Sequence, residues 1–194
     1  MRLRLNSEMD EETRTAWALF GEAVEWLREN YRQFEFWVER DVVWTLQTRL
    51  RTMISERGLS FTVLSDYGML PGPRRSLSAD LVIRNAAGHV LVAAELKYEP
   101  SHLRPEFQSQ PGKLPVVFWG ADGVAKDVAR IRQFVEAGAA RAAFAMFIDE
   151  GRHFRARPPH IGSEWRDWDS AGPGNLSPAV LWSQWPQPGT EAPA

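Results

Sequence analysis

The chain has 194 residues, of which 44% are hydrophobic and 25% are charged, a balance typical of one globular domain with a sizeable core. Its formal net charge of -2 gives no global basic field for nucleic acid, so we expect any such partner to be held locally. The absence of cysteine excludes disulfides, thiolate metal sites and a cysteine nucleophile. No run approaches the ~18 apolar residues of a membrane span, and the first residues lack the apolar core of a signal peptide. We therefore expect a soluble, cytoplasmic protein with no membrane partner.

Two amphipathic helices are predicted at the start of the domain. From Ser7 to Tyr31, apolar residues recur at helical spacing after an acidic first turn. A second helix is predicted from near Phe34 to about Arg57, where Gly58 ends it. Its apolar stripe consists of Phe36, Val43, Leu46, Leu50, Met53 and Ile54.

The hydrophobic period then changes to that of strands. Residues 61–64 predict a short strand, and residues 68–73 predict a loop because they are rich in glycine and proline. Residues 79–84 and 90–98 predict two further strands. The intervening residues 85–88 have turn composition, so we expect these two strands to form a hairpin.

The second half of the chain predicts a crossover followed by an extension. A helix is expected from Gly123 to Ala137, with Asp122 as its cap, and a buried strand from Arg141 to Ile148. A strand, helix, strand order implies a right-handed crossover. Residues 156–194 are rich in proline and tryptophan without periodicity, and predict an irregular extension that wraps the domain. We interpret residues 1–194 as a single domain whose core spans about 34–148.

Three charged residues in the predicted hairpin suggest chemistry. Strand alternation places Glu95 and Lys97 on one face, and hairpin pairing places Asp80 opposite or diagonal to Glu95. Carboxylate oxygens suit Mg²⁺ or Mn²⁺, and a lysine beside a metal-bound water can orient or deprotonate it. The pattern points to metal-assisted hydrolysis of a phosphodiester. The alternative is an exposed ion pair, but both carboxylates interrupt apolar strands, where they need a partner or a metal.

The spacing of these residues resembles that of a known family. Asp80, fourteen intervening residues and then Glu95-Leu96-Lys97 resemble the signature of the PD-(D/E)XK nuclease superfamily. The predicted element order from about residue 34 to 148 resembles the restriction-endonuclease-like core of that superfamily. The resemblance implies an α/β fold with a helix, a three-stranded antiparallel meander, a helix and a strand, preceded here by an extra N-terminal helix.

The resemblance also implies roles for the signature residues. Asp80, Glu95 and the carbonyl of Leu96 would be ligands of Mg²⁺ or Mn²⁺, and Lys97 would be the catalytic lysine. Ala79 stands where the family has the proline of its name, which affects no ligand.

Neighbouring elements offer further candidates. Glu39 precedes Val43 and Leu46 by four and seven residues, so it lies on the apolar stripe of the second helix and is expected to complete the catalytic set. Glu35 is the competing candidate, and solvation or pairing of Glu39 is the alternative. Lys126, Asp127, Arg130 and Gln133 occupy the polar side of the helix after the motif, and for most of them we expect a solvated face. In the superfamily this helix often supplies a polar residue, for which Lys126 or Gln133 would be the candidates.

Basic residues near the motif are candidates for nucleic-acid binding. They are Arg74, Arg75, Lys113 and Lys126, and Arg104 also follows the motif. These side chains could contact phosphates, or they could be ordinary solvated charges. The four histidines, at positions 89, 102, 153 and 160, have no metal-ligand spacing.

The sequence therefore predicts a Mg²⁺- or Mn²⁺-dependent nuclease that acts by attack of metal-activated water, with DNA favoured over RNA on superfamily grounds alone. One alternative is a nuclease-like subunit that no longer cuts and binds nucleic acid or protein in a larger assembly. Another is a structural subunit in which the three signature residues form a salt-bridged cluster. Because the chain shows no separate reader domain, targeting would come from a partner, a homodimer, a larger complex or the loops.

Overall fold

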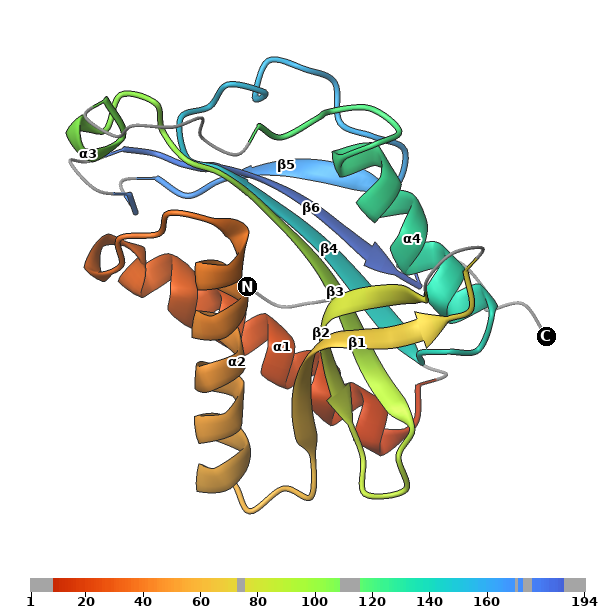
Figure 1. Ribbon diagram of the computed structural model, residues 1–194. Coiled ribbons are helices and arrows are strands. Elements are labelled where there is room, and N and C mark those ends of the chain that lie inside the picture. Colours follow the sequence, from red (N-terminus) through yellow and green to blue (C-terminus); the bar gives the residue numbers. More distant parts are fainter. Residues whose placement is uncertain (1–8, 73–75, 109–115, 170, 173–175, 187–194) are drawn as a thin grey trace.

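A six-stranded mixed sheet forms the centre of the protein (Figure 1). The computed structural model describes residues 9–72, 76–108, 116–169, 171–172 and 176–186. The strands are β1 (Thr62–Leu70), β2 (Leu77–Arg84), β3 (Val90–Glu99), β4 (Ala142–Asp149), β5 (Ser163–Asp167) and β6 (Ala179–Trp185). The helices are α1 (Glu11–Asn30), α2 (Glu39–Glu56), the short α3 (Pro105–Gln108) and α4 (Val124–Glu136), and a 3-10 turn spans Tyr31–Gln33. The predicted α/β class is confirmed.

The strand order is β1-β2-β3-β4-β6-β5. Strands β3 and β4 are parallel, and α4 lies in the connection between them. The other neighbouring strands are antiparallel, including the predicted β2–β3 hairpin. The arrangement therefore contains a single β-α-β unit within an otherwise antiparallel sheet in the described part of the chain.

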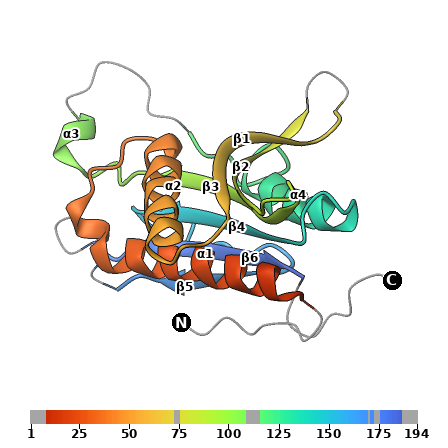
Figure 2. The same cartoon turned by 90° about the horizontal axis from the view of Figure 1, so that it is seen from below.

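Helices cover both faces of the sheet, α1 and α2 on one and α4 on the other (Figures 1 and 2). The larger core lies under α1 and α2, where Phe20 and Trp17 pack against Phe144. A smaller core lies under α4, where Ile131 and Phe134 pack on alanine-rich β3 and β4. The small side chains of these strands let α4 approach the sheet closely, which positions its polar residues over β3.

Several predicted boundaries differ from the structure. Helix α2 begins at Glu39 rather than near Phe34, because the Asp41 carboxylate accepts hydrogen bonds from the backbone N–H groups of Trp37 and Val38 and fixes the start there. Strand β1 continues to Leu70, through residues 68–70 of the predicted loop. The cap of α4 is Gly123 rather than Asp122.

The close approach of two backbone segments explains this glycine cap. A side-chain carbon at Gly123 would lie 1.8 Å from the carbonyl oxygen of Phe118, which also accepts the N–H of Val124 at 2.8 Å. Only glycine fits this contact.

The prediction of an irregular C-terminal extension is wrong. Residues 163–167 and 179–185 form β5 and β6, and β6 pairs with β4 in the interior of the sheet. Alternation was absent because β6 is buried on both faces from Ala179 to Ser183, so its sequence has no polar face. No helix in the described part of the chain has the length and apolar character needed to cross a bilayer.

Candidate metal and catalytic site

The candidate site lies where β2 and β3 separate. Their ladder pairs Leu81 with Ala94, and in the same register the next opposed residues are Asp80 and Glu95. At that point the Asp80 carboxylate, rather than a backbone carbonyl, accepts the N–H of Leu96 at 2.7 Å. The Asp80 carboxylate therefore lies in the gap between the two strands and lines a groove with residues of α2, whereas the Glu95 carboxylate lies beside Arg130 of α4.

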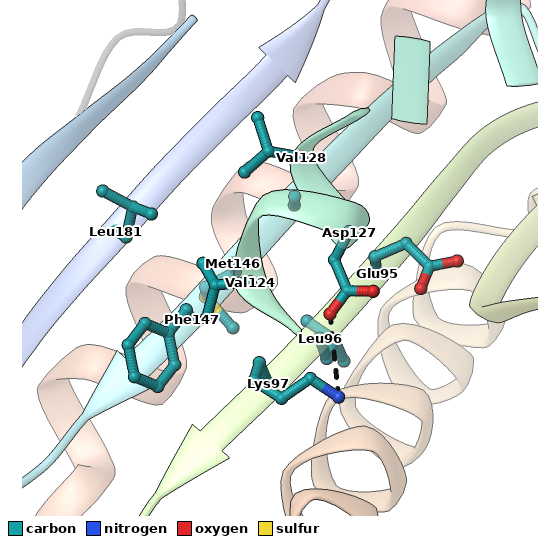
Figure 3. Close-up of a pocket in the computed structure, with 10 residues that line it drawn as sticks. Glu95, Leu96, Lys97, Val124, Asp127, Val128, Met146, Phe147 and Leu181 are labelled. Carbon is teal, nitrogen blue, oxygen red and sulfur yellow. Dashed lines mark ion pairs between the residues drawn. The ribbon is translucent and has the colours of Figure 1, made fainter. Parts of the chain in front are cut away.

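Lys97 brings two helices to this site. Its amine lies 2.6 Å from the Glu39 carboxylate, at the first residue of α2, and 3.6 Å from the Asp127 carboxylate in α4. Figure 3 shows Glu95 and Lys97 along β3, with Asp127 pointing from α4 toward the Lys97 amine. The lysine thus joins one helix from each side of the sheet.

Glu95 has a different partner. Its Oε2 accepts a hydrogen bond from the Arg130 guanidinium of α4 at 2.9 Å. The other oxygen, Oε1, is buried and has no hydrogen-bond partner among the described residues. Because Glu95 is only 2% exposed, this free oxygen is costly unless the carboxyl is protonated or binds a cation.

Burial shifts the proton affinities of these groups. Burial raises the pKa of Asp80 to about 7 and that of Glu95 to about 9, and repulsion from Asp80 adds to the shift at Glu95. The pKa of Asp127 is also raised by burial. Burial alone would lower the pKa of the Lys97 amine, but the carboxylates of Glu39 and Asp127 outweigh it and raise this pKa. Lys97 is therefore a cation at neutral pH.

An open groove of about 270 Å³ begins at the site and runs between α2 and β1. Its lining residues are Glu39, Arg40, Val43, Trp44, Gln47, Ser65, Asp66 and Asp80. The Trp44 side chain is 69% exposed beside it. The groove gives Asp80 and Glu39 access to solvent, whereas Glu95 lines a small cavity of about 10 Å³ under α4.

The structure also places the other predicted candidates on helices α2 and α4 and the residues before α2. Glu35 is exposed, whereas Glu39 contacts Lys97, so the structure brings Glu39 and not Glu35 to the signature residues. Lys126 is 42% exposed with its amine 3.9 Å from Asp127, and Gln133 is exposed.

Of the basic candidates for nucleic-acid binding outside α4, the structure describes only Arg104. Arg104 is turned inward rather than toward a phosphate, since it is 5% exposed and donates to the Phe36 carbonyl at 2.9 Å. Arg74, Arg75 and Lys113 lie outside the described residues.

The sequence placed Asp127 and Arg130 on the polar, solvated side of their helix, which is wrong because Asp127 is buried beside Lys97 and Arg130 pairs with Glu95, and it did not single out Trp44. A signal for Asp127 was present, since it follows Val124 by three residues and precedes Ile131 by four, on the apolar stripe of α4. This is the criterion that singled out Glu39 on the second helix. Arg130 and Trp44 carried no such signal, because arginines and single tryptophans on helix surfaces are ordinary.

Comparison with protein-family models, with curated proteins and with solved structures gave no match. The site is therefore interpreted from its own geometry and chemistry.

Proposed function

We propose that this protein is a Mg²⁺- or Mn²⁺-dependent nuclease with a restriction-endonuclease-like core, acting on DNA in preference to RNA. The observation that carries the proposal is the proximity of Asp80 and Glu95 where β2 and β3 separate, with Lys97 two residues after Glu95 on the same face of β3. Apart from the short α3 between β3 and α4, the order α2, β1, β2, β3, α4, β4 is the order that the resemblance implies. The preference for DNA rests on the superfamily alone.

The donor set fits a hard divalent cation. Asp80 and Glu95 supply carboxylate oxygens, one of them the buried and unpartnered Glu95 Oε1, and the Leu96 carbonyl follows Glu95 directly in the chain. The raised pKa values of the two carboxyls show how poorly the protein alone compensates their charges. When bound there, Mg²⁺ or Mn²⁺ supplies Lewis-acid chemistry that lowers the pKa of water and neutralises phosphate charge.

The chain's own residues position a cation beside the two carboxylates. Because Glu39 and Asp127 raise the pKa of the Lys97 amine, Lys97 is protonated at neutral pH. A protonated amine cannot accept a proton, so the expected role of Lys97 is to orient water and to stabilise negative charge on the phosphoryl oxygens. Glu39 and Asp127 act through Lys97 and are positioning residues.

The groove beside Asp80 suits a nucleic-acid strand. Trp44 exposes most of its ring there, and a base can stack on an indole with about 1–3 kcal/mol of binding energy. Arg40 is the basic side chain in the lining and can contact a phosphate.

We expect Trp44→Ala to raise KM severalfold for single-stranded substrate with little change in kcat. The control is Ile161→Ala, at an exposed site in the loop before β5, which should leave both KM and kcat unchanged.

The decisive experiment is a cleavage assay on single- and double-stranded DNA and RNA with Mn²⁺, Mg²⁺ or EDTA. Metal-dependent cleavage by the wild-type protein should fall at least about 100-fold in Lys97→Ala purified identically. The exposed Arg132→Ala variant in α4 is the matched control and should cleave normally. Cleavage that persists in Lys97→Ala would reject the proposal, and its source would be a contaminant or another site.

The pairing of Lys97 with Glu39 and of Arg130 with Glu95 favours a second candidate, a structural salt-bridge cluster without activity. A thermal shift measurement separates the two functions. In the nuclease, Mn²⁺ stabilises the wild type more than Asp80→Asn, because the ion binds the folded state at Asp80, whereas in the structural cluster it stabilises the two proteins equally.

A further inference from the structure

A second cluster of metal-ligating side chains lies at the carboxyl ends of the parallel strands β3 and β4. Glu99 ends β3, His102 follows it in the next loop, and His153 lies in the loop after β4. One ligand atom from each of the three side chains lies within 4.8 Å of the other two. The three residues were not connected by spacing in the sequence, since Glu99 and His153 are 54 positions apart.

Each member of this cluster is held in place. Glu99 is buried, its Oε2 accepts the N–H of Val117 at 3.1 Å, and its Oε1 lies 2.8 Å from Nε2 of His102. The imidazoles of His102 and His153 are 4.4 Å apart between centroids. A carboxylate oriented by a backbone N–H, with two adjacent imidazoles, is the arrangement that supports metal ligands in proteins.

The backbone of the loop that carries His153 is held in a defined conformation. The buried Asp149 carboxylate accepts the N–H groups of His153 and Phe154 at 2.8 and 2.7 Å, which fixes the backbone. Arg152 adopts a left-handed conformation with φ 58°, which tightens the loop. A side-chain carbon at Gly151 would lie 2.3 Å from Nε2 of His153, so an alanine there would displace the exposed imidazole from this position.

We propose that Glu99, His102 and His153 form a site for a divalent transition-metal ion such as Zn²⁺, distinct from the Asp80 and Glu95 site. Two imidazole nitrogens and one carboxylate oxygen are ligands that Zn²⁺ prefers, and Mg²⁺ disfavours the nitrogens. Tetrahedral coordination with bonds of about 2.1 Å places ligand atoms about 3.4 Å apart, so small side-chain rotations suffice. The exposed imidazoles leave a coordination position open to solvent.

The ion would be separate from any cation held by Glu95. Four residues along a strand span roughly 13 Å, so Glu95 and Glu99 cannot hold one ion together. A metal at Glu99 would cross-link the loops after β3 and β4. Because it binds only the folded arrangement, it would stabilise the protein.

The test is to titrate the EDTA-treated, tag-free protein with Zn²⁺. A second titration uses Co²⁺, whose binding is monitored by its visible absorption. We expect one equivalent bound in wild type and in Asp80→Asn, with a thermal stabilisation that excess Mg²⁺ does not abolish. Affinity should fall more than about 10-fold in His102→Ala and in His153→Ala, and should fall in Gly151→Ala, which removes no ligand. The exposed His89→Ala is the matched control and should bind normally.

Histidine ring signals in NMR spectra give a readout that does not need a variant to fold. Zn²⁺ should shift the signals of His102 and His153 and leave those of His89 and His160 in place. Absence of saturable binding, or unchanged affinity in a folded His102→Ala/His153→Ala double variant, would overturn the proposal. Because Asp80→Asn removes only the first site, failure of the nuclease proposal and failure of this one are distinguishable.

Discussion

Asp80, Glu95 and Lys97, the three charged residues of the β2–β3 hairpin, have different environments. Substitutions of these residues should therefore affect metal binding and cleavage in different ways. Asp80 opens to a groove, Glu95 is buried beside Arg130, and Lys97 is held as a cation by Glu39. The differences arise from neighbours supplied by α2 and α4 rather than from the residue types. Single substitutions can therefore distinguish a residue that binds the metal from a residue that acts in catalysis.

Asp80→Asn removes a negative charge that would offset the metal, so Mn²⁺ affinity and cleavage should fall together. Lys97→Ala removes a cation from the same site, so Mn²⁺ affinity should be unchanged or higher while cleavage falls at least about 100-fold. Calorimetry and a cleavage assay on both variants measure the two effects. A fully active Lys97→Ala enzyme would refute the mechanism.

The raised pKa of Asp80 predicts how the metal-free protein depends on pH. In the folded state this carboxyl keeps its proton up to about pH 7, whereas in the unfolded chain it loses it near pH 4. Between these values the folded state binds more protons, so the free energy of unfolding decreases as pH rises. In EDTA, the Tm of wild type should fall more from pH 5 to 7 than that of Asp80→Asn. Parallel Tm curves would contradict the assignment.

At the scale of elements, α4 determines the chemistry over β3. The alanines of β3 and β4 allow this helix to lie close to the sheet, and Asp127 and Arg130 then reach Lys97 and Glu95. Helix α2 contributes from the opposite side, through Glu39 in its first turn. The site thus depends on how two helices dock.

Arg130→Met should destabilise the metal-free protein by about 1–3 kcal/mol. The substitution leaves Glu95 without its cation, although protonation of Glu95 limits the loss. Arg132→Met, at an exposed position of the same helix, should change stability by less than about 0.5 kcal/mol. Urea unfolding of both variants measures the difference, and equal costs would show that the Arg130 pair contributes nothing.

At the scale of the whole molecule, the C-terminal strands are part of the central sheet. Strand β6 pairs with β4 along seven residue pairs and buries Trp182 against Phe20 and Phe144. A chain without β6 would expose the edge of β4 and a large apolar surface. The domain therefore extends well beyond the core expected from the sequence.

A chain that ends at residue 156 should not fold cooperatively, and Trp182→Ala should cost about 3–5 kcal/mol. Circular dichroism during thermal unfolding and size-exclusion chromatography measure these outcomes. A truncated chain that unfolds cooperatively as a monomer would instead support a detachable extension.

The sequence by itself determined the features that depend on local pattern. Helical periodicity indicated α1, α2 and α4, and the apolar runs around Asp80 and Glu95 indicated β2 and β3. Turn composition predicted the hairpin, with Asp80 opposite or diagonal to Glu95. The turn pairs Arg84 with Val90, however, and the register that aligns Asp80 with Glu95 follows a register shift between Ile83 and Arg84, which turn composition did not indicate. The position of Glu39 on an apolar stripe indicated its direction, and the structure places it at Lys97.

Only the tertiary structure decided the rest. Strand β6 has no alternation because both of its faces are buried, so local pattern could not reveal it. Arg130 became a partner of Glu95, and His153 a neighbour of Glu99, through contacts between residues 35 and 54 positions apart. Such contacts depend on how α4 and β4 pack against β3, and a single sequence carries no periodic signal for that packing.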